Sequence, residues 1–502
     1  MQYLDVVGDP ASRTPAAVAV SCGDHSLTFA QLDERVGRLG GALRARGIAL
    51  GDRVALLAAN ELEYVEIQGA CLRSGFTFVP LNRRLADPEL EFILRDCGAS
   101  VLIAGRHDEQ VAQRVVPEGC LLVALGREGN AERYDDLLAS SEPEPVSDPD
   151  DPTIAATILY TSGTTGRPKG AVIDRFGFTV RVLVNTIELS PSGVDRWLAV
   201  LPMFHIGAFL CYAYLYAGAE VVMLEEFDPD GCLRTIRDRD VSAMVVVPTI
   251  LKMLLDRIED EDIELPSLRL IVYGGSSIEP SLLARAVERL GCGFHQQYGM
   301  TEMGAQTVLR PSDHDPTDTG RLSSAGREAA TFSLRIVGEA DDDVAGGEVG
   351  EIICRGPAVS TMYWNRPDAT VETWRGGWFH TGDLGYRDAN GYLHIVDRRN
   401  DQIVTGGENV YPREVEAALL EHAGVVDVAV IGTPDDTWGQ VVTAVLAGTS
   451  VTDLELEAWL AGRIARYKIP RRWIRMDELP RNATGKVLKG ELRTRCATEG
   501  TE

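Results

Sequence analysis

The apolar residues in the N-terminal part of the chain follow two spacings in turn. Residues 27–46 carry leucine and valine three or four positions apart, the spacing of one helix face, and residues 54–59 form a short apolar run that predicts a strand. The order returns later, where residues 241–247 predict a strand, residues 251–258 a helix and residues 268–273 another strand. This repetition predicts an α/β fold in which helices cover parallel sheets on both faces, with ligands at the carboxyl ends of the strands.

The pattern changes after Gly320. Residues 332–337 and 351–355 are short alternating runs separated by turn-forming residues, which predicts a small β-rich subdomain. From Tyr392 a strand-like run leads to Pro412, which opens a helix with one apolar face. The remaining length suits a separate α+β domain of roughly 100 residues at the C-terminus.

The composition is that of a globular protein, and the net charge limits the classes of partner that it can bind. Of the 502 residues, 45% are hydrophobic and 25% charged. The 49 lysines and arginines against 75 aspartates and glutamates give a net charge of −26, so we predict no nucleic-acid partner. The nine cysteines lack zinc spacing, and the chain shows neither a signal-peptide pattern nor an apolar run of about 18 residues. We therefore predict a cytoplasmic protein with reduced thiols and no transmembrane segment.

The strongest chemical signal is the run TSGTTGRPKG at residues 161–170. Glycines let backbone amides approach a polyanion, hydroxyls donate hydrogen bonds and an ammonium supplies charge, so the run predicts a phosphate-binding loop. It is not a Walker A loop, because Pro168 stands where that motif needs a glycine before Lys169. Only five of the 49 basic residues are lysines, so a retained lysine indicates a place where a compact ammonium is needed.

Together with this loop, a series of further motifs resembles the adenylate-forming enzymes, which include acyl-CoA synthetases, peptide-synthetase adenylation domains and firefly-type luciferases. The resemblance covers nearly the whole chain and is closest to the acyl-CoA synthetases. The further motifs are LPMFHIG at 201–207, YGGSSIEP at 273–280, QQYGMTE at 296–302, TGDLGYRDANGYLHIVDRR at 381–399, GGENVYPREVE at 406–416 and PRNATGK at 480–486.

The resemblance implies a fold, a reaction and its cofactors. The fold would be a large N-terminal domain over residues 1–396, a hinge over 397–401 and a small C-terminal lid domain over 402–502. A substrate carboxylate would attack the α-phosphorus of ATP in the presence of Mg²⁺, giving an acyl-adenylate and pyrophosphate. Coenzyme A would then attack the acyl-adenylate and release AMP.

The same resemblance assigns the ATP site. Thr301 would bond the α-phosphate and Glu302 would hold Mg²⁺, which prefers oxygen ligands. Asp383 and Arg398 would bind the ribose, and Tyr298 would stack on the adenine. The other ATP or AMP contacts implied are Thr161, Ser162, Gly163, Thr164, Thr165, Gly166, Lys169, Gly274, Gly275, Ser276, Gln297 and Gly299.

The C-terminal motifs imply the lid chemistry. Lys486 would reach the carboxylate and phosphate where negative charge gathers, so it is a predicted catalytic residue. Asn400 stands at the hinge position, where the family usually has aspartate or lysine, and this departure bears on the balance between the two half-reactions. Coenzyme A contacts are implied for Gly406, Gly407, Glu408, Arg84, Trp438 and Lys468.

The acid substrate is predicted from the segment 203–210. Amino-acid-activating relatives carry an aspartate there, whereas this segment has no carboxylate to pair with a substrate ammonium. His205 would be a gate between the acyl pocket and the thiol tunnel. The implied acyl pocket consists of Phe204, Ile206, Gly207, Val247, Met300 and Gly304. These residues are uncharged and several are small, which predicts a medium-chain, long-chain or bulky cyclic acid.

Alternatives to an acid–CoA ligase stay open at this point. One is a ligase that loads an acyl-adenylate onto an acyl carrier protein, and another is an enzyme that performs mainly the thioester-forming half-reaction. A catalytically idle scaffold is a third, although the motif residues expected to be lost in such a protein are present.

Overall fold

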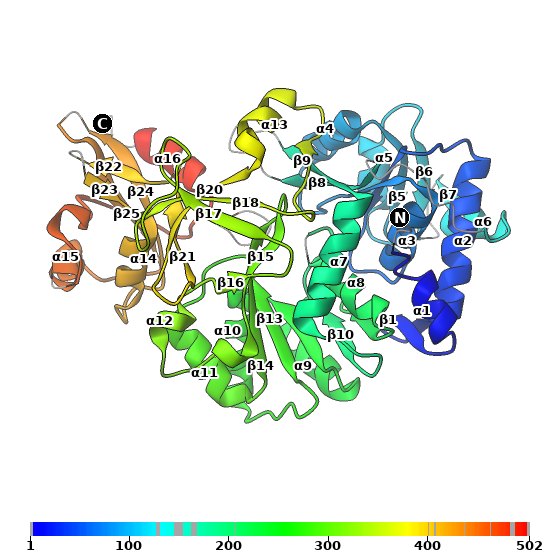
Figure 1. Ribbon diagram of the computed structural model, residues 1–502, viewed down its shortest axis with the longest axis horizontal. Helices are drawn as coiled ribbons and strands as arrows, with labels where there is room; N and C mark the ends of the chain where they lie inside the picture. Colours follow the sequence, from blue (N-terminus) through cyan, green and yellow to red (C-terminus); the bar gives the residue numbers. More distant parts are fainter. Residues whose placement is uncertain are drawn as a thin grey trace. The chain divides into compact units, whose positions relative to one another are not determined.

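The computed structural model divides the chain into two compact units (Figure 1). Unit 1 comprises Met1–Leu334 and Cys354–Phe379, and unit 2 comprises Arg335–Ile353 and His380–Glu502. The described residues are 4–126, 131–144, 154–161, 168–205, 207–399, 401–405, 408–435, 437–461, 463–481 and 487–498.

Unit 1 contains a nine-stranded sheet with a parallel centre. Strands β14, β13, β12, β10, β11 and β1 run parallel to one another, and antiparallel strands flank them at each end. Its order is β16 (Arg327–Glu328), β15 (Gly304–Leu309), β14 (Gly293–Met300), β13 (Leu270–Gly274), β12 (Ala243–Val246), β10 (Arg196–Ala199), β11 (Glu220–Met223), β1 (Val18–Cys22) and β2 (His25–Thr28).

A second sheet of unit 1 has eight strands, again mostly parallel. Strands β9 and β19 are antiparallel to their neighbours and bring residues 362–363 beside the strand that starts at Lys169. The order is β19 (Met362–Tyr363), β9 (Lys169–Asp174), β8 (Ala155–Thr161), β4 (Thr77–Pro80), β3 (Arg53–Leu57), β5 (Ala99–Ala104), β6 (Leu121–Ala124) and β7 (Glu132–Arg133).

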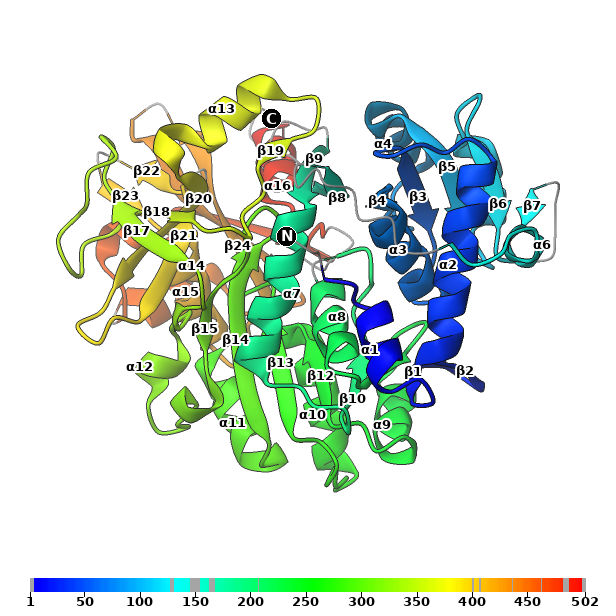
Figure 2. The ribbon, with the colours of Figure 1, turned by 45° about the vertical axis from the view of Figure 1, so that its right-hand side comes forward.

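Helices cover both faces of these sheets. The largest core cluster joins the two sheets through α2 (Phe29–Ala45), α3 (Glu63–Ser74), α7 (Arg175–Leu189) and α8 (Ala208–Tyr216). Helices α7 and α8 lie side by side (Figure 1 and Figure 2), and α8 is apolar on every side, as expected of a buried helix. Helices α9 (Pro229–Asp238), α10 (Pro248–Asp260) and α11 (Pro280–Leu290) belong to a second cluster, and α4 (Asp87–Cys97) and α5 (Glu109–Val115) to a third.

Short helices complete unit 1. These are α1 (Gly8–Arg13), α6 (Tyr134–Ala139), α12 (Thr319–Leu322) and α13 (Pro367–Thr373), with 3-10 turns at Pro311–Asp313 and Arg375–Gly377.

Unit 2 is built from two sheets and contains the predicted β-rich segment. The four-stranded sheet has the order β17 (Ser333–Val337), β18 (Gly350–Arg355), β20 (Phe379–Arg387) and β21 (Leu393–Arg398). The five-stranded sheet has the order β23 (Glu408–Val410), β22 (Ile403–Thr405), β25 (Gly439–Ala447) and β24 (Asp427–Asp435), with β26 (Arg472–Met476) parallel to β25. Its helices are α14 (Pro412–Leu420), α15 (Asp453–Ala461) and α16 (Lys489–Thr498), with a 3-10 turn at Arg466–Lys468.

The predicted α/β class is confirmed, since parallel sheets covered by helices form unit 1 and an α+β arrangement forms the end of unit 2. Contacts group strands β17, β18, β20 and β21 with the C-terminal elements. The hinge predicted at 397–401 stays a prediction, because one structure does not show a rotation between domains. Its residue Asn400 lies outside the described residues.

All nine cysteines are free thiols. Burial raises the pKa of eight of them, to about 11 for Cys22 and Cys120 and to about 12 for Cys292, for example. Across the described ranges, none of the helices has both the length and the apolar character needed to span a membrane.

The buried histidine His295 on β14 predicts a loss of stability in acid. Neither of its ring nitrogens has a hydrogen-bond partner among the described residues, and burial, with His314 and Arg310 nearby, lowers its pKa to about 3. An unfolded histidine titrates near its ordinary pKa of about 6.5, so unfolding takes up a proton below that pH. His295 therefore costs about 1.4 kcal/mol of unfolding free energy for each pH unit between about 6.5 and 3.

We expect His295→Leu to flatten this pH dependence by about 1.4 kcal/mol per pH unit between pH 6.5 and 4.5, as measured by urea unfolding. His25→Leu is the matched control, because His25 is exposed on β2 and should leave the slope unchanged. Equal slopes for the His295 variant and the unmodified protein would contradict the prediction.

Candidate active site

The predicted phosphate-binding loop connects two paired strands of unit 1. Strands β8 and β9 are antiparallel, and their register sets Thr161 opposite Lys169, with Oγ1 of Thr161 3.4 Å from the Lys169 carbonyl oxygen. The structure therefore brings the two ends of the loop together. Ser162, Gly163, Thr164, Thr165 and Gly166 lie outside the described residues, so their phosphate contacts stay predictions.

Asp96 at the end of α4 anchors the base of this loop. Its Oδ2 accepts a hydrogen bond of 2.7 Å from the Tyr160 hydroxyl, and its carbonyl accepts one of 3.0 Å from the Trp364 indole. The Trp364 backbone N–H in turn donates to the Gly170 carbonyl at 2.8 Å. Both strands that carry the loop are thus held by buried or partly buried side chains.

Tyr363 connects Lys169 to Glu302. Strand β19 pairs with β9, which places the Tyr363 ring 5.3 Å from Nζ of Lys169, a distance at which the ammonium interacts with the ring face. The Tyr363 hydroxyl donates to Oε1 of Glu302 at 2.8 Å. Glu302 is only 8% exposed. Unit 1 therefore places a phosphate-loop cation and the predicted magnesium ligand on two sides of one tyrosine.

The turn that carries Thr301 and Glu302 joins β14 to β15 and needs glycine at both ends. A Cβ on Gly299 would lie 1.9 Å from the Gly304 carbonyl oxygen, and Gly304 has a φ of +72°. Any larger residue at Gly299 would push the two strands apart.

Arg181 holds this turn from helix α7. Each of its three guanidinium nitrogens donates to a carbonyl oxygen, that of Thr301 at 3.0 Å, Glu302 at 3.1 Å and Ala358 at 2.8 Å. Burial lowers the pKa of Arg181 to about 9, although the nearby carboxylates of Glu302 and Asp174 oppose the shift. Sequence reasoning missed Arg181 and Tyr363. An arginine inside the apolar helical run 176–184 is the one signal that could have indicated the former.

The predicted adenine-binding residues meet where β13 and β14 end. Gly274 pairs with Gln297, and a Cβ on Gly274 would lie 2.4 Å from the Gln297 carbonyl oxygen, so only glycine allows this approach. Gly275 follows with a φ of +82°, ahead of Ser276. Tyr298 is the next residue on β14 and is partly buried. The structure brings these residues together, and the stacking of adenine on Tyr298 stays a prediction.

The structure describes residues of the predicted acyl pocket from three segments of the chain. Val247 lies close to Gly275, since a Cβ added there would be 3.6 Å from Val247 Cγ1. The rings of Phe204 and His205 have centroids 4.4 Å apart. Gly207 precedes helix α8, and Met300 and Gly304 lie at the facing ends of β14 and β15, whereas Ile206 lies outside the described residues.

The surroundings of His205 favour the neutral form of its imidazole. Burial, with a smaller contribution from the charge of Arg84, lowers its pKa to about 4. Its Nε2 is buried and has no hydrogen-bond partner among the described residues. A histidine with so low a pKa is a weak base, which favours a role in shaping a passage over a role in proton transfer.

In unit 2, Asp383 and Arg398 form a preformed pair. They lie opposite each other on β20 and β21, and Nε of Arg398 is 2.8 Å from Oδ1 of Asp383. The Asp383 backbone N–H donates to Oγ1 of Thr381, and this hydroxyl donates to the Ile352 carbonyl. The two residues predicted to bind ribose thus come together on one sheet.

The predicted coenzyme A residues have mixed surroundings. Lys468 donates to both carboxylate oxygens of Glu414 at 2.6 Å. Trp438 is 39% exposed, and the Arg471 guanidinium lies 4.1 Å from its ring centroid. Glu408 is exposed at the start of β23. Lys486, Gly406 and Gly407 lie outside the described residues, so their roles stay predictions.

The sequence matches two family models. The model described as AMP-binding enzyme matches residues 8–364, and the model described as AMP-binding enzyme C-terminal domain matches residues 414–486.

Curated relatives align with almost the full length. A feruloyl-CoA synthase from Amycolatopsis sp is 39% identical over 97% of both chains, and an indoleacetate–CoA ligase from Aromatoleum aromaticum is 39% identical over 98% of both. A fatty acid–[acyl-carrier-protein] ligase, ScoC from Streptomyces coeruleorubidus, is 37% identical over 97% of this chain and 94% of its own.

Solved structures agree with these matches. The o-succinylbenzoate CoA synthetase MenE from Bacillus subtilis, in complex with its acyl-adenylate intermediate, has a TM-score of 0.88 and 32% identity over 98% of both chains. The same enzyme has also been solved with ATP and magnesium ion, with a TM-score of 0.86 and 32% identity over 98% of this chain and 100% of that chain. These findings confirm the predicted enzyme class, and the chain belongs to the AMP-binding enzyme family, within its acid–CoA ligases.

Proposed function

We propose that this enzyme uses ATP and Mg²⁺ to activate an aromatic or other cyclic carboxylic acid as its acyl-adenylate, and then transfers the acyl group to coenzyme A. The observation that carries the proposal is the cluster of Lys169, Tyr363 and Glu302, which sets an ammonium and a buried carboxylate at the base of the phosphate-binding loop. We further propose that it works in the cytoplasm, where its nine thiols would stay reduced.

In the first half-reaction, a carboxylate oxygen of the substrate attacks the α-phosphorus of ATP and pyrophosphate leaves. The ammonium of Lys169 would attract the phosphate oxygens, and Thr301 would bond the α-phosphate. Glu302 fits Mg²⁺ because it offers a hard oxygen ligand from a shielded position, and Mg²⁺ supplies positive charge to the phosphate oxygens when bound. Tyr363 fixes the orientation of that carboxylate.

In the second half-reaction, the thiolate of coenzyme A attacks the acyl carbonyl and AMP leaves. Asp383 and Arg398 would hold the ribose of the nucleotide, and Trp438, Lys468 and Arg84 would contact coenzyme A. We assign His205 to the passage between acid and thiol, because its low pKa keeps it uncharged there.

The choice of a cyclic acid rests on the pocket and on the relatives. The rings of Phe204 and His205 pack against each other, and Val247, Gly275 and Gly304 add no charge and little side-chain volume. A planar ring suits such surroundings, because rings stack on rings. Relatives named for ferulate, indoleacetate and 2-succinylbenzoate support the same choice.

A carrier protein is the second candidate for the acyl acceptor. The relative named as a fatty acid–[acyl-carrier-protein] ligase favours it, at an identity close to that of the CoA ligases. A carrier protein presents the same thiol arm as coenzyme A, so the two acceptors differ in what surrounds that arm.

The acid preference is tested by mass-spectrometric detection of acyl-CoA and AMP with a panel of aromatic, indolic and straight-chain acids. We expect kcat/KM for at least one ring-containing acid to exceed that for straight-chain acids by about tenfold or more, the discrimination a shaped apolar pocket supplies. A preference for the straight-chain acids would overturn the substrate class. AMP formation with an acyl carrier protein in place of coenzyme A would favour the second acceptor.

The role of Tyr363 is tested by Tyr363→Phe, which keeps the ring beside Lys169 but removes the hydrogen bond to Glu302. Loss of a hydrogen bond to a charged group should raise the Mg²⁺ concentration needed for half-maximal pyrophosphate exchange by about tenfold or more. Tyr134→Phe is the matched control, because it removes a tyrosine–glutamate hydrogen bond elsewhere in unit 1. An unchanged Mg²⁺ requirement in Tyr363→Phe would contradict the assignment.

For Lys486→Ala we expect acid-dependent pyrophosphate exchange to fall by about 100-fold or more, while attack of coenzyme A on a supplied acyl-adenylate is retained. Lys252→Ala serves as the control, because Lys252 is exposed on α10 and pairs only locally, with Asp256. Normal adenylation in the Lys486 variant would exclude the proposed role.

A further inference from the structure

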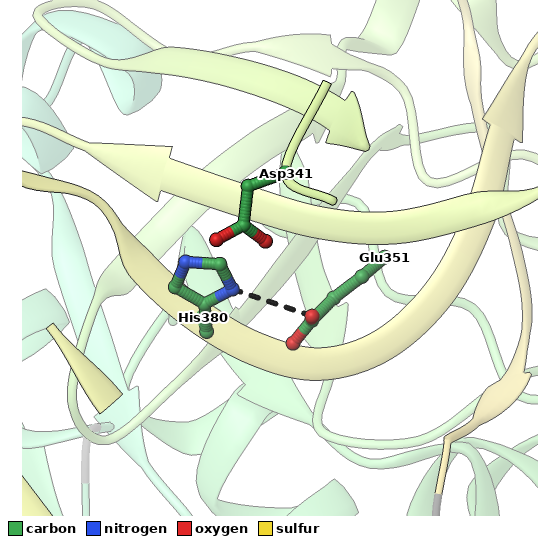
Figure 3. Close-up of side chains that lie close together, drawn as sticks. All are labelled: Asp341, Glu351 and His380. Carbon is green, nitrogen blue, oxygen red and sulfur yellow. Dashed lines mark hydrogen bonds and ion pairs between the residues drawn. The ribbon is translucent and has the colours of Figure 1, made fainter. Parts of the chain in front are cut away.

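Unit 2 contains a buried carboxylate, that of Glu351, close to Asp383 and Arg398, the pair proposed to bind ribose. Glu351 is on β18, next to β20 in the sheet, and is 6% exposed. Figure 3 shows its side chain converging with those of His380 and Asp341. None of the sequence motifs includes Glu351, and the proposed chemistry does not use it.

Both oxygens of Glu351 are engaged. Oε1 accepts a hydrogen bond of 3.2 Å from the Gly382 backbone N–H. Oε2 lies 3.3 Å from Nδ1 of His380 (Figure 3) and 3.1 Å from Nη1 of Arg399. One carboxylate therefore contacts the two residues on β20 that closely precede Asp383 and the residue that follows Arg398.

Glu351 thus contacts the chain neighbour of each member of the pair, Gly382 beside Asp383 and Arg399 beside Arg398. Gly382 has a φ of +69°, a conformation that a hydrogen bond to its N–H helps to fix. The Arg399 backbone N–H donates to the Gly382 carbonyl at 2.8 Å, so the two segments that Glu351 holds also hold each other. Removal of the Glu351 carboxylate would take a hydrogen bond from the Gly382 N–H and an ion pair from the Arg399 side chain.

The alternative interpretation is that Asp341, Glu351 and His380 bind a metal ion. One ligand atom from each of Asp341, Glu351 and His380 lies within 4.8 Å of the others. However, the Arg399 guanidinium occupies the same Glu351 oxygen that faces His380. A metal cation at this oxygen would have to displace the Arg399 guanidinium, because two positive charges would otherwise lie side by side. The geometry therefore favours a hydrogen-bonded network over a metal centre.

We propose that Glu351 is a positioning residue, which sets Asp383 and Arg398 for the two ribose hydroxyls of ATP through Gly382 and Arg399. This inference rests on the proposed function, because it requires Asp383 to bind the ribose. Glu351 itself touches no substrate, so its effect would appear in how the enzyme recognises the sugar.

The test compares ATP with 2′-deoxy-ATP and 3′-deoxy-ATP in acid-dependent pyrophosphate exchange by the full-length enzyme. Glu351→Gln places an amide where His380 and Arg399 donate, so we expect KM for ATP to rise about tenfold and the preference for ATP over both deoxy analogues to fall by a similar factor. KM for the acid should stay within about twofold, a split that general loss of structure would not produce.

Two further variants keep the test decisive. Arg399→Gln removes one contact from a side chain that is 48% exposed, and it should move the same readouts in the same direction by a smaller factor even if Glu351→Gln folds poorly. Glu348→Gln is the matched control, because Glu348 is exposed in the turn before β18 and should behave as the unmodified protein.

Asp383→Asn separates failure of this inference from failure of the proposed function. If Asp383→Asn loses the preference for ATP while Glu351→Gln and Arg399→Gln keep it, the positioning role is overturned and the ribose assignment stands. If all three variants keep the preference, the ribose assignment fails and the inference fails with it. Stoichiometric Zn²⁺ or Mn²⁺ bound by the unmodified enzyme and lost in Glu351→Gln would identify a metal centre and also overturn the positioning role.

Discussion

A single buried guanidinium, that of Arg181, holds the turn on which the predicted phosphate site of unit 1 depends. Arg181 cannot be buried at low cost unless its guanidinium is hydrogen-bonded, and each of its three nitrogens donates to a backbone carbonyl. Two of those carbonyls belong to Thr301 and Glu302. The hydrogen bonds that satisfy Arg181 therefore also hold the turn that carries the side chains predicted to contact ATP and Mg²⁺.

The two parallel sheets explain why the remaining residues of unit 1 gather nearby. Strand β13 ends at Gly274 and Gly275 follows it, and the end of β14 leads to Thr301 and Glu302. From the other sheet, β9 begins at Lys169 and pairs with β19, which brings Tyr363. The carboxyl ends of parallel strands lie along one edge of a sheet. In the nine-stranded sheet, the antiparallel turn from β14 to β15, with Gly299 and Gly304 at its ends, continues this edge.

Much of this arrangement could be predicted from the sequence, because the motif residues are close together along the chain and their types match their chemistry. Thr161 and Lys169, or Gly274 and Gly275, are of this kind. The contacts of the supporting residues could not be predicted, since their partners are distant: Arg181 is 120 positions from Thr301, and Tyr363 is 61 positions from Glu302. Lys468 shows a different limit, because the family resemblance implied a coenzyme A contact for it and gave no indication of its pairing with Glu414. These contacts between residues distant in the sequence become visible only in the folded structure.

The buried cysteines have a consequence for an enzyme that makes a mixed anhydride. An acyl-adenylate reacts with thiolates, and a protein with nine cysteines could acylate itself. Burial raises the pKa of eight of these thiols, so at neutral pH they are protonated and poor nucleophiles. The same packing that stabilises the core thus leaves the incoming thiol with little competition from the enzyme that presents it with the activated acid.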